Sequence, residues 1–359
     1  MTRTRLRDLG ITIGEWPTGP HNAITDVAGV WVGHQTVVYD QPRVARTGVT
    51  VILPRGRETW SDHVFAGFHS FNGNGEMTGL PWLEESGIVG CPIGLTNTHQ
   101  VGLVRDALVA YAVEHRYFDD FMLPVAAETY DGWLNDIDAF HLNQADVFAA
   151  FEAARPGPVA EGNVGGGTGM ICHEFKGGIG TASRRVESHS GAFTVGVLVQ
   201  ANYGSRKDLR VNGVPVGREI GPDHTPTPRT EVKADGSIII IVATDAPLLA
   251  GQCKRLAQRA TVGLARLGGV GHNGSGDIFL AFATGNHLPT NPTQPVALTM
   301  LPHHHMDPLF EGVAEATEEA ILNALTSAET MTGFAGHTVH ALPLTELQRV
   351  MAKYQPAHL

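Results

Sequence analysis

The most apolar segment of the chain, 237–244 (SIIIIVAT), directly follows a polar segment that has no hydrophobic period. A β-branched run of this length is typical of a strand that is buried on both faces. Strand-like patterns also occur at five other places: 24–38, 49–53, 192–200, 277–283 and 338–342. Because these patterns do not alternate strictly with helical ones, the order of elements favours a layered α/β sandwich with antiparallel or mixed sheets.

Helical patterns occupy three segments: 99–114, 247–267 and 308–328. Before the second of these, Asp245 is placed to act as the N-cap, and Pro247 lies inside the first turn. The polar segment 218–236 contains three prolines and alternating charges. This composition predicts an exposed, mobile loop.

The length of 359 residues fits one large α/β domain or two domains. Glycine contributes 43 residues, nearly twice the average usage of about 7%. This excess predicts many tight turns or close approaches between backbones. The three cysteines, Cys91, Cys172 and Cys253, are spaced too widely for a CxxC metal site or a disulfide framework, so we expect small core residues.

Charge and hydropathy limit the partners and the location. The 25 basic and 36 acidic side chains give a net charge of −11, without a long basic run, so nucleic acid and anionic membranes are poor candidate partners. The N-terminus lacks the apolar region of a secretory signal, and no apolar run reaches transmembrane length. These features predict a cytoplasmic protein.

Two motifs suggest cofactors but fail on their context. The segment 269–274 (GVGHNG) matches G-x-G-x-x-G, but it follows a predicted helix and precedes a predicted strand, the reverse of the dinucleotide-binding order. The run 303–305 (HHH) with Asp307 has metal-ligating side chains, but adjacent residues splay apart in a Pro-bounded loop. We therefore predict no organic cofactor and no metal.

The junction Gly236-Ser237 carries the most informative chemistry. If the chain were cut there, Ser237 would begin a core strand with a free α-amino group beside its own hydroxyl. An α-amine titrates at about 7.7–8.0 and can therefore act as a base for that nucleophile, and glycine permits the strained backbone of an N→O acyl shift. Taken alone, the spacing favours the simpler interpretation, an ordinary turn from a loop into a strand.

Three further motifs are suggestive but not decisive alone. In the segment 275–277, alternation points Ser275 and Asp277 in the same direction, although such pairs are also common in turns. Glu128 and Tyr130 precede a turn, where the alternative is a helical first turn with a buried aromatic ring. The Gly-rich segment 162–181 requires close packing or positive φ, and by itself could be a pair of tight loops.

Together these motifs resemble the self-processing N-terminal-serine aminopeptidases, the family of the L-aminopeptidase/D-esterase-amidase and the β-peptidyl aminopeptidases. The resemblance extends over nearly the whole chain and is carried by five motifs in order: 128–135 (ETYDGWLN), 167–181 (GTGMICHEFKGGIGT), 197–204 (VLVQANYG), 236–248 (GSIIIIVATDAPL) and 273–277 (NGSGD). Five ordered motifs are far more specific than any one of them.

The resemblance implies one αββα sandwich formed by residues 1–359, similar in architecture to the N-terminal nucleophile hydrolases but differently connected. It also implies that a precursor cuts itself between Gly236 and Ser237 into an α chain, 1–236, and a β chain, 237–359. Members of this family assemble as homotetramers, so we expect an oligomer of such pairs.

The resemblance also assigns roles to individual residues. Ser237 matches the nucleophile; Ser275 and Asp277 match its proton-handling partners, the second of which is glutamate in some relatives. Asn202 matches the oxyanion donor and Tyr130 a tyrosine near the nucleophile. Glu128 matches the carboxylate that binds the substrate's free amino group, which agrees with the need of an exopeptidase for a fixed anion.

We therefore predict an autoproteolytic serine aminopeptidase, amidase or esterase that releases N-terminal residues from small peptides, amides or esters. One alternative is an acyltransferase of related architecture, which passes the acyl group to an amine. Another is a catalytically silent binding protein of the same fold. The side chain and stereochemistry of the substrate depend on pocket walls that the sequence does not display.

Overall fold

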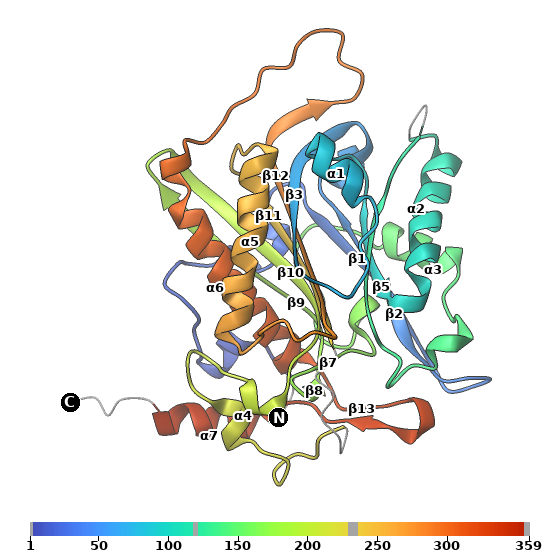
Figure 1. The fold of residues 1–359 in the computed structure, drawn as a ribbon, viewed down its shortest axis with the longest axis vertical. Coiled ribbons are helices and arrows are strands. Elements are labelled where there is room, and N and C mark those ends of the chain that lie inside the picture. The colour runs from blue at the N-terminus through green and yellow to red at the C-terminus, as the bar shows by residue number, and fades with distance from the viewer. Residues whose placement is uncertain (1–2, 118–120, 229–235, 355–359) are drawn as a thin grey trace.

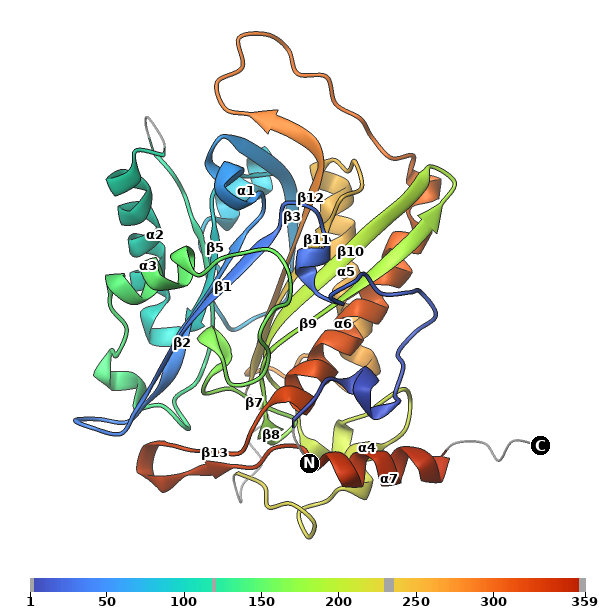
Figure 2. The same ribbon diagram turned by 180° about the vertical axis from the view of Figure 1, so that it is seen from behind.

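The structure of the chain is a computed structural model that describes residues 3–117, 121–228 and 236–354. Within these residues, two large β-sheets lie face to face, and helices cover the outer face of each sheet (Figures 1 and 2). The layers therefore follow the order helix, sheet, sheet, helix. This arrangement confirms the αββα sandwich that the sequence predicts.

One sheet is four-stranded, in the order β1-β2-β5-β6. Of the pairs of adjacent strands that the structure describes in this sheet, only β5 and β6 are parallel. Helices α2 and α3 cover its outer face (Figure 1). The bounds of these elements are β1 (Trp31–Tyr39), β2 (Ala45–Leu53), β5 (Ile93–Asn97), β6 (Val125–Thr129), α2 (Val101–His115) and α3 (Gln144–Glu152).

The other sheet is six-stranded, in the order β4-β3-β12-β11-β10-β9, and only its central pair, β12 and β11, is parallel within the described residues. Helices α5 and α6 cover its outer face (Figure 2). The bounds are β3 (Asp62–Gly73), β4 (Ile88–Val89), β9 (Gly178–Ser188), β10 (Gly191–Asn202), β11 (Ser237–Thr244), β12 (Gly276–Pro289), α5 (Ala250–Arg266) and α6 (Asp307–Ser327).

Shorter elements complete the described part of the chain. Among all the described helices, none is both long and apolar enough to cross a bilayer. Two small hairpins, β7–β8 and β13–β14, lie near the end of the sandwich where β10 ends and β11 begins (Figure 2). The remaining bounds are α1 (Leu80–Ser86), α4 (Val216–Glu219), α7 (Leu344–Tyr354), β7 (Ile171–Cys172), β8 (Phe175–Lys176), β13 (Met331–Thr332) and β14 (Thr338–Val339).

Strand β11 shows why its sequence is apolar throughout. Ile238, Ile240 and Val242 belong to the core between the six-stranded sheet and its helices, whereas the intervening Ile239, Ile241 and Ala243 belong to the core between the two sheets. Every residue of β11 is buried, because side chains of a strand alternate between two faces and both faces are covered here. The predicted bounds of this strand are confirmed.

The start of the first predicted strand is wrong. Residues Ile24–Asp26 form a 3₁₀ turn, and β1 begins only at Trp31. The carboxylate of Asp26 accepts the Ala23 N–H (3.0 Å), a side-chain cap that competes with extended pairing. At the other end of the chain, the strand predicted at 338–342 is reduced to the two residues of β14.

The predicted helix cap at Asp245 is also wrong. Helix α5 begins at Ala250, where the Gln252 side chain accepts the Leu249 N–H (3.1 Å). Asp245 instead accepts the N–H of Thr194 (2.7 Å) on the neighbouring strand β10. A contact across the sheet thus takes the carboxylate that the local sequence assigns to the helix.

The polar segment before Ser237 is more ordered than its composition predicts. Its first residues complete α4, and Thr225 is buried where its carbonyl accepts the Arg206 guanidinium (2.5 Å). Residues 229–235 of the predicted loop lie outside the described residues. The three cysteines are buried, which confirms them as small core residues.

Candidate active site

The predicted nucleophile lies at one end of the six-stranded sheet, where the ends of three neighbouring strands are side by side. Ser237 is the first residue of β11; it is opposite Asn202 on antiparallel β10 and opposite Gly276 on parallel β12. The Gly276 N–H donates to the Gly236 carbonyl (3.1 Å), which ties the residue before the nucleophile to β12. Ser237 is 5% exposed. The sheet therefore holds the Gly236–Ser237 peptide bond between two neighbouring strands.

Gly236 fits because of space. A β carbon at this position would lie 2.6 Å from the Asn202 carbonyl oxygen at the end of β10 and 2.7 Å from Cα of Tyr203, the residue that follows this strand. Gly236 has no positive φ, so close approach explains the glycine better than the strained backbone suggested by the sequence. Asp235, the preceding residue of the predicted junction, lies outside the described residues.

Ser275 and Asp277 form the buried pair that strand alternation predicts. The Ser275 hydroxyl donates to Asp277 Oδ1 (2.7 Å), and both side chains are nearly inaccessible. Burial raises the pKa of the Asp277 carboxyl to about 6, against the opposing effects of hydrogen bonds from Ser275 and the Ile238 backbone and of the nearby His272. Since Ile238 directly follows Ser237, this pair is fixed beside the nucleophile's strand.

Asn202 is oriented by two main-chain groups. Its Oδ1 accepts the Ile171 N–H (2.8 Å), and its Nδ2 donates to the Tyr130 carbonyl (2.9 Å). A primary amide nitrogen carries two hydrogens, and the part of the chain that the structure describes provides one acceptor for Asn202 Nδ2, so its other N–H remains for a further acceptor. Because Asn202 and Ser237 are opposite each other in the β10–β11 ladder, this neutral donor is located at the nucleophile.

Glu128 comes from the other sheet, near the end of β6. Its carboxylate accepts the Glu76 N–H (3.0 Å) and the Thr98 hydroxyl, and the side chain is 3% exposed. Burial raises the pKa of Glu128, while these two hydrogen bonds act in the opposite direction. Gly75 adjoins both the Glu128 carboxylate and the Gly276 backbone, so this anion lies close to the edge that carries Ser237.

Tyr130 directly follows β6, and its side chain is 46% exposed. The alternative of a helical first turn with a buried aromatic ring is therefore wrong for this motif. The Tyr130 main chain contributes to the site through its carbonyl, which accepts Asn202 Nδ2. The structure thus brings the main chain of Tyr130 together with Asn202, while its phenol ring lies at the surface.

Sequence patterns did not identify Thr98 or Lys176. Thr98 contacts Glu128 only because β5 and β6 run parallel, which places their ends side by side. Lys176 is a fully buried lysine beside the Gly-rich segment, and its burial is not visible in the sequence. Among the described residues, no group of three or more His, Cys, Asp or Glu side chains is arranged to hold a metal, and His303–His305 form an exterior 3₁₀ turn.

Comparison with known proteins identifies the family of the chain. The profile of Peptidase family S58 matches residues 22–339, most of the chain. The chain belongs to peptidase family S58. The S58 chain is similar to the β-peptidyl aminopeptidase BapA of Sphingosinicella microcystinivorans, with 47% identity over 98% of this chain and 92% of that protein. It is also 44% identical to the BapA protein of Sphingosinicella xenopeptidilytica, over 97% and 90% of the two chains.

Two solved structures resemble the S58 chain closely. The l-aminopeptidase d-ala-esterase/amidase from Ochrobactrum anthropi, described as a variant among the Ntn hydrolase fold, matches with a TM-score of 0.92 and 45% identity over 98% of both chains. A Burkholderia sp. β-aminopeptidase matches with a TM-score of 0.92 and 50% identity, over 98% of this chain and 100% of the other. The S58 chain is accordingly a hydrolase, an aminopeptidase with an Ntn-type fold.

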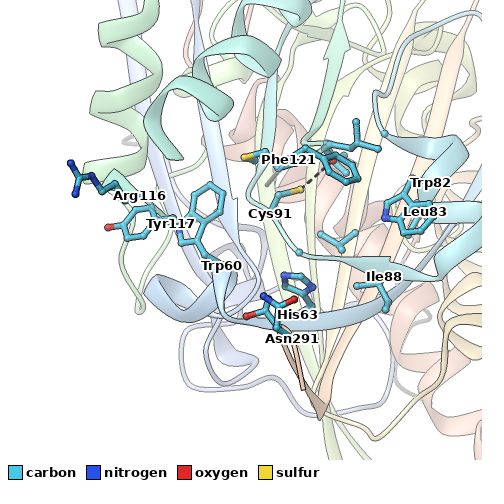
Figure 3. A pocket seen from close by; sticks show the side chains of 17 residues that line it. Trp60, His63, Trp82, Leu83, Ile88, Cys91, Arg116, Tyr117, Phe121 and Asn291 are labelled. Atoms are coloured by element: carbon cyan, nitrogen blue, oxygen red, sulfur yellow. Dashed lines mark hydrogen bonds between the residues drawn. The ribbon is translucent and has the colours of Figure 1, made fainter. Parts of the chain in front are cut away.

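Figure 3 shows a hollow that is lined by His63 near the start of β3 and by Val125 at the start of β6. The site at Ser237 is near the other ends of these strands, where Glu128 is located on β6 and Gly73 of β3 pairs with Gly276. The hollow has a volume of about 410 Å³. Trp60, Trp82 and His63 line it together with Cys91, whose thiol pKa burial raises to about 12. None of the six predicted catalytic and substrate-binding residues lines this hollow, so it is separate from the site at Ser237.

Proposed function

We propose that this S58 aminopeptidase cleaves itself between Gly236 and Ser237 and then uses Ser237 to hydrolyse small peptides, amides or esters. One observation carries the proposal: the Gly236–Ser237 bond lies at the start of a buried central strand, between Asn202 and the Ser275–Asp277 pair. Cleavage there yields chains of 236 and 123 residues. It also frees the α-amino group of Ser237.

The free amine supplies the base that the serine needs. Its neutral form takes the proton from Ser237 Oγ while Oγ attacks the substrate carbonyl, and the free N–H of Asn202 Nδ2 stabilises the oxyanion. The proton passes to the leaving amine or alcohol as the tetrahedral intermediate collapses to the acyl-enzyme. Water then attacks the ester with the same base, releasing the acid and regenerating Ser237. The Ser275–Asp277 pair orients and polarises these hydroxyl and amine groups.

Glu128 gives the reaction its preference for free N-termini. The substrate's ammonium group pairs with the Glu128 carboxylate, which fixes the scissile bond at a set distance from Ser237. Thr98 and the Glu76 N–H hold that carboxylate in place. Because both BapA relatives are named β-peptidyl aminopeptidases, we include peptides with N-terminal β-amino acids among the proposed substrates.

Denaturing electrophoresis of the purified protein tests self-cleavage directly. We expect two fragments of 236 and 123 residues, and a single uncut chain in the Ser237→Ala variant. N-terminal sequencing of the smaller fragment is expected to begin at Ser237. An intact wild-type chain that still hydrolyses aminoacyl p-nitroanilides would contradict the mechanism.

We also propose that the enzyme is a homotetramer and that it resides in the cytoplasm, as predicted from the sequence. The segment after β12 extends away from the sandwich (Figures 1 and 2) and carries exposed Val296, Leu298 and Met300, which supports self-association. Light scattering during size-exclusion chromatography is expected to give four times the 38.3 kDa chain mass. The mass of a single chain would refute the assembly.

A further inference from the structure

A small hairpin, which contributes no side chain to the proposed reaction, makes one of the two hydrogen bonds that orient the Asn202 amide. Strands β7 and β8 pair with Ile171 opposite Lys176. The Ile171 N–H donates to Asn202 Oδ1, which determines which end of the amide faces the hairpin. With the amide in this orientation Nδ2 is the atom near Tyr130, and rotation of the amide would replace the free donor by a carbonyl oxygen.

Lys176 closes the base of this hairpin. Its side chain is fully buried, and Nζ donates to the carbonyls of Gly177 (2.8 Å) and Gly167 (3.4 Å). The Gly177 N–H in turn donates to the Met170 carbonyl (2.9 Å), so one ammonium connects the segment before the hairpin to the segment after it. Within the described residues, these two carbonyls are the only hydrogen-bond acceptors of Nζ.

Such an ammonium is expensive to bury. Burial lowers the pKa of Lys176 to about 7, and the groups whose charges oppose this are Cys172 and Asp131. A methionine would fill the same volume without that cost. The charged donor is therefore best explained by what it holds, namely the Gly-rich segment that leads directly into Ile171.

The tip of the hairpin is fixed to the segment that follows Asn202. His173 and Glu174 both have positive φ (49° and 60°), the backbone of a two-residue turn that usually requires glycine or asparagine. The His173 N–H and Nδ1 donate to the carbonyls of Tyr203 (2.6 Å) and Ser205 (3.0 Å), and Arg206 donates to the Glu174 carbonyl (2.6 Å). These contacts hold a conformation that the residue types disfavour.

We propose that the hairpin Ile171–Lys176 sets the orientation of the Asn202 amide, and that Lys176 is the positioning residue that holds the base of the hairpin. The inference rests on the oxyanion role of Asn202 proposed above. Loss of the ammonium removes the donors to Gly167 and Gly177, so the Ile171 N–H shifts relative to Asn202 Oδ1. Transition-state stabilisation then falls, while substrate binding through Glu128 is unaffected.

A double-mutant cycle tests this inference. The variants are Lys176→Met, Asn202→Ala and the double variant, with exposed Lys207→Met as the matched control. The kcat and KM for an aminoacyl p-nitroanilide are normalised to Ser237 titrated with an acylating inhibitor, which counts only processed, folded sites. If Lys176→Met does not mature, Lys176→Gln, which keeps an N–H donor on a shorter side chain, supplies the comparison.

Lys176→Met is expected to lower kcat roughly 10- to 100-fold, with KM unchanged within about twofold. In the Asn202→Ala background the same change is expected to have an effect below about twofold, because the group through which it acts is gone. Equal effects in both backgrounds, or a rise in KM alone, would overturn the inference. If Asn202→Ala itself leaves kcat unchanged, the oxyanion role of Asn202 fails instead.

Discussion

At the scale of single residues, the site is built from carboxylates that are held in unfavourable surroundings. Asp277 and Glu128 are both almost inaccessible, and burial raises the pKa of each. A buried carboxylate destabilises the folded state at neutral pH because folding removes the charged form from water. Such a cost in stability is kept where the charged form is needed for function. A variant that lacks the charge should therefore be more stable than the wild type.

Asp277→Asn is therefore expected to stabilise the fold while inactivating the enzyme. The folded pKa of about 6 exceeds the ordinary 3.8, so wild-type stability falls as pH rises between these values. At pH 7 the variant should be more stable by about 1–3 kcal/mol, and the difference should shrink near pH 4. Thermal unfolding of both chains in the uncut Ser237→Ala background measures this.

The exposed Asp223→Asn serves as the control and is expected to change stability little. A less stable Asp277→Asn chain at pH 7 would mean that the hydrogen bond from Ser275, rather than burial, dominates the energetics of this carboxylate.

Glu128→Gln tests recognition of the substrate's amino group. Glutamine can still accept the Glu76 N–H, so the site keeps its shape while it loses its charge. We expect kcat/KM for substrates with a free amine to fall on the order of 10²-fold, with a much smaller change for N-acetylated analogues. Steady-state kinetics on matched pairs of substrates measure the ratio, with exposed Glu85→Gln as the control. Unchanged selectivity for free amines would remove Glu128 from this role.

At the scale of elements, strand β9 approaches α6 closely at Gly180. A β carbon on Gly180 would lie 1.9 Å from the Ala320 carbonyl oxygen and 2.7 Å from Ala324 N, both backbone atoms of α6. Gly180→Ala must therefore separate the strand from the helix, which typically costs about 1–3 kcal/mol. Gly102 in α2 is exposed and has open space around it, so Gly102→Ala should stabilise the chain by about 0.5–1 kcal/mol.

Unfolding in the Ser237→Ala background should therefore shift in opposite directions for the same substitution at these two glycines. A neutral Gly180→Ala would show that α6 can move away from the sheet at little cost.

Local patterns predicted the elements whose surroundings are uniform. Strand β11 is buried on both faces and α6 is buried nearly all round, so their residue types match their positions from end to end. Prediction failed where a distant partner decides. Asp245 accepts a hydrogen bond from a neighbouring strand instead of capping the helix that follows it. Lys176 is buried and donates to backbone carbonyls, and no periodicity in the sequence indicates that burial. The predicted site residues came from motif resemblance, because strand pairing across the chain brings them together.

At the scale of the whole molecule, the proposed cut would divide the six-stranded sheet in an unusual way. Strands β11 and β12 would belong to the C-terminal fragment, yet they lie between β3 and β10 of the N-terminal fragment. Helices α5 and α6 of the C-terminal fragment cover that same sheet. Separating the fragments would break two complete strand pairings and expose both hydrophobic cores.

The two fragments are consequently expected to stay together after cleavage. Native size-exclusion chromatography should give one peak that contains both fragments in equal molar amounts, and separation should require denaturant at concentrations that also abolish the circular dichroism of the sheets. The uncut Ser237→Ala chain is the reference, because it has the same strand pairings and one extra peptide bond. Unfolding of the cleaved pair should shift to higher denaturant as concentration rises, and more steeply than that of the uncut chain, because both share the proposed contacts between copies and only the cleaved pair also separates into two fragments. Fragments that dissociate in native buffer would show that the central pairings β10–β11 and β3–β12 do not hold the processed enzyme together.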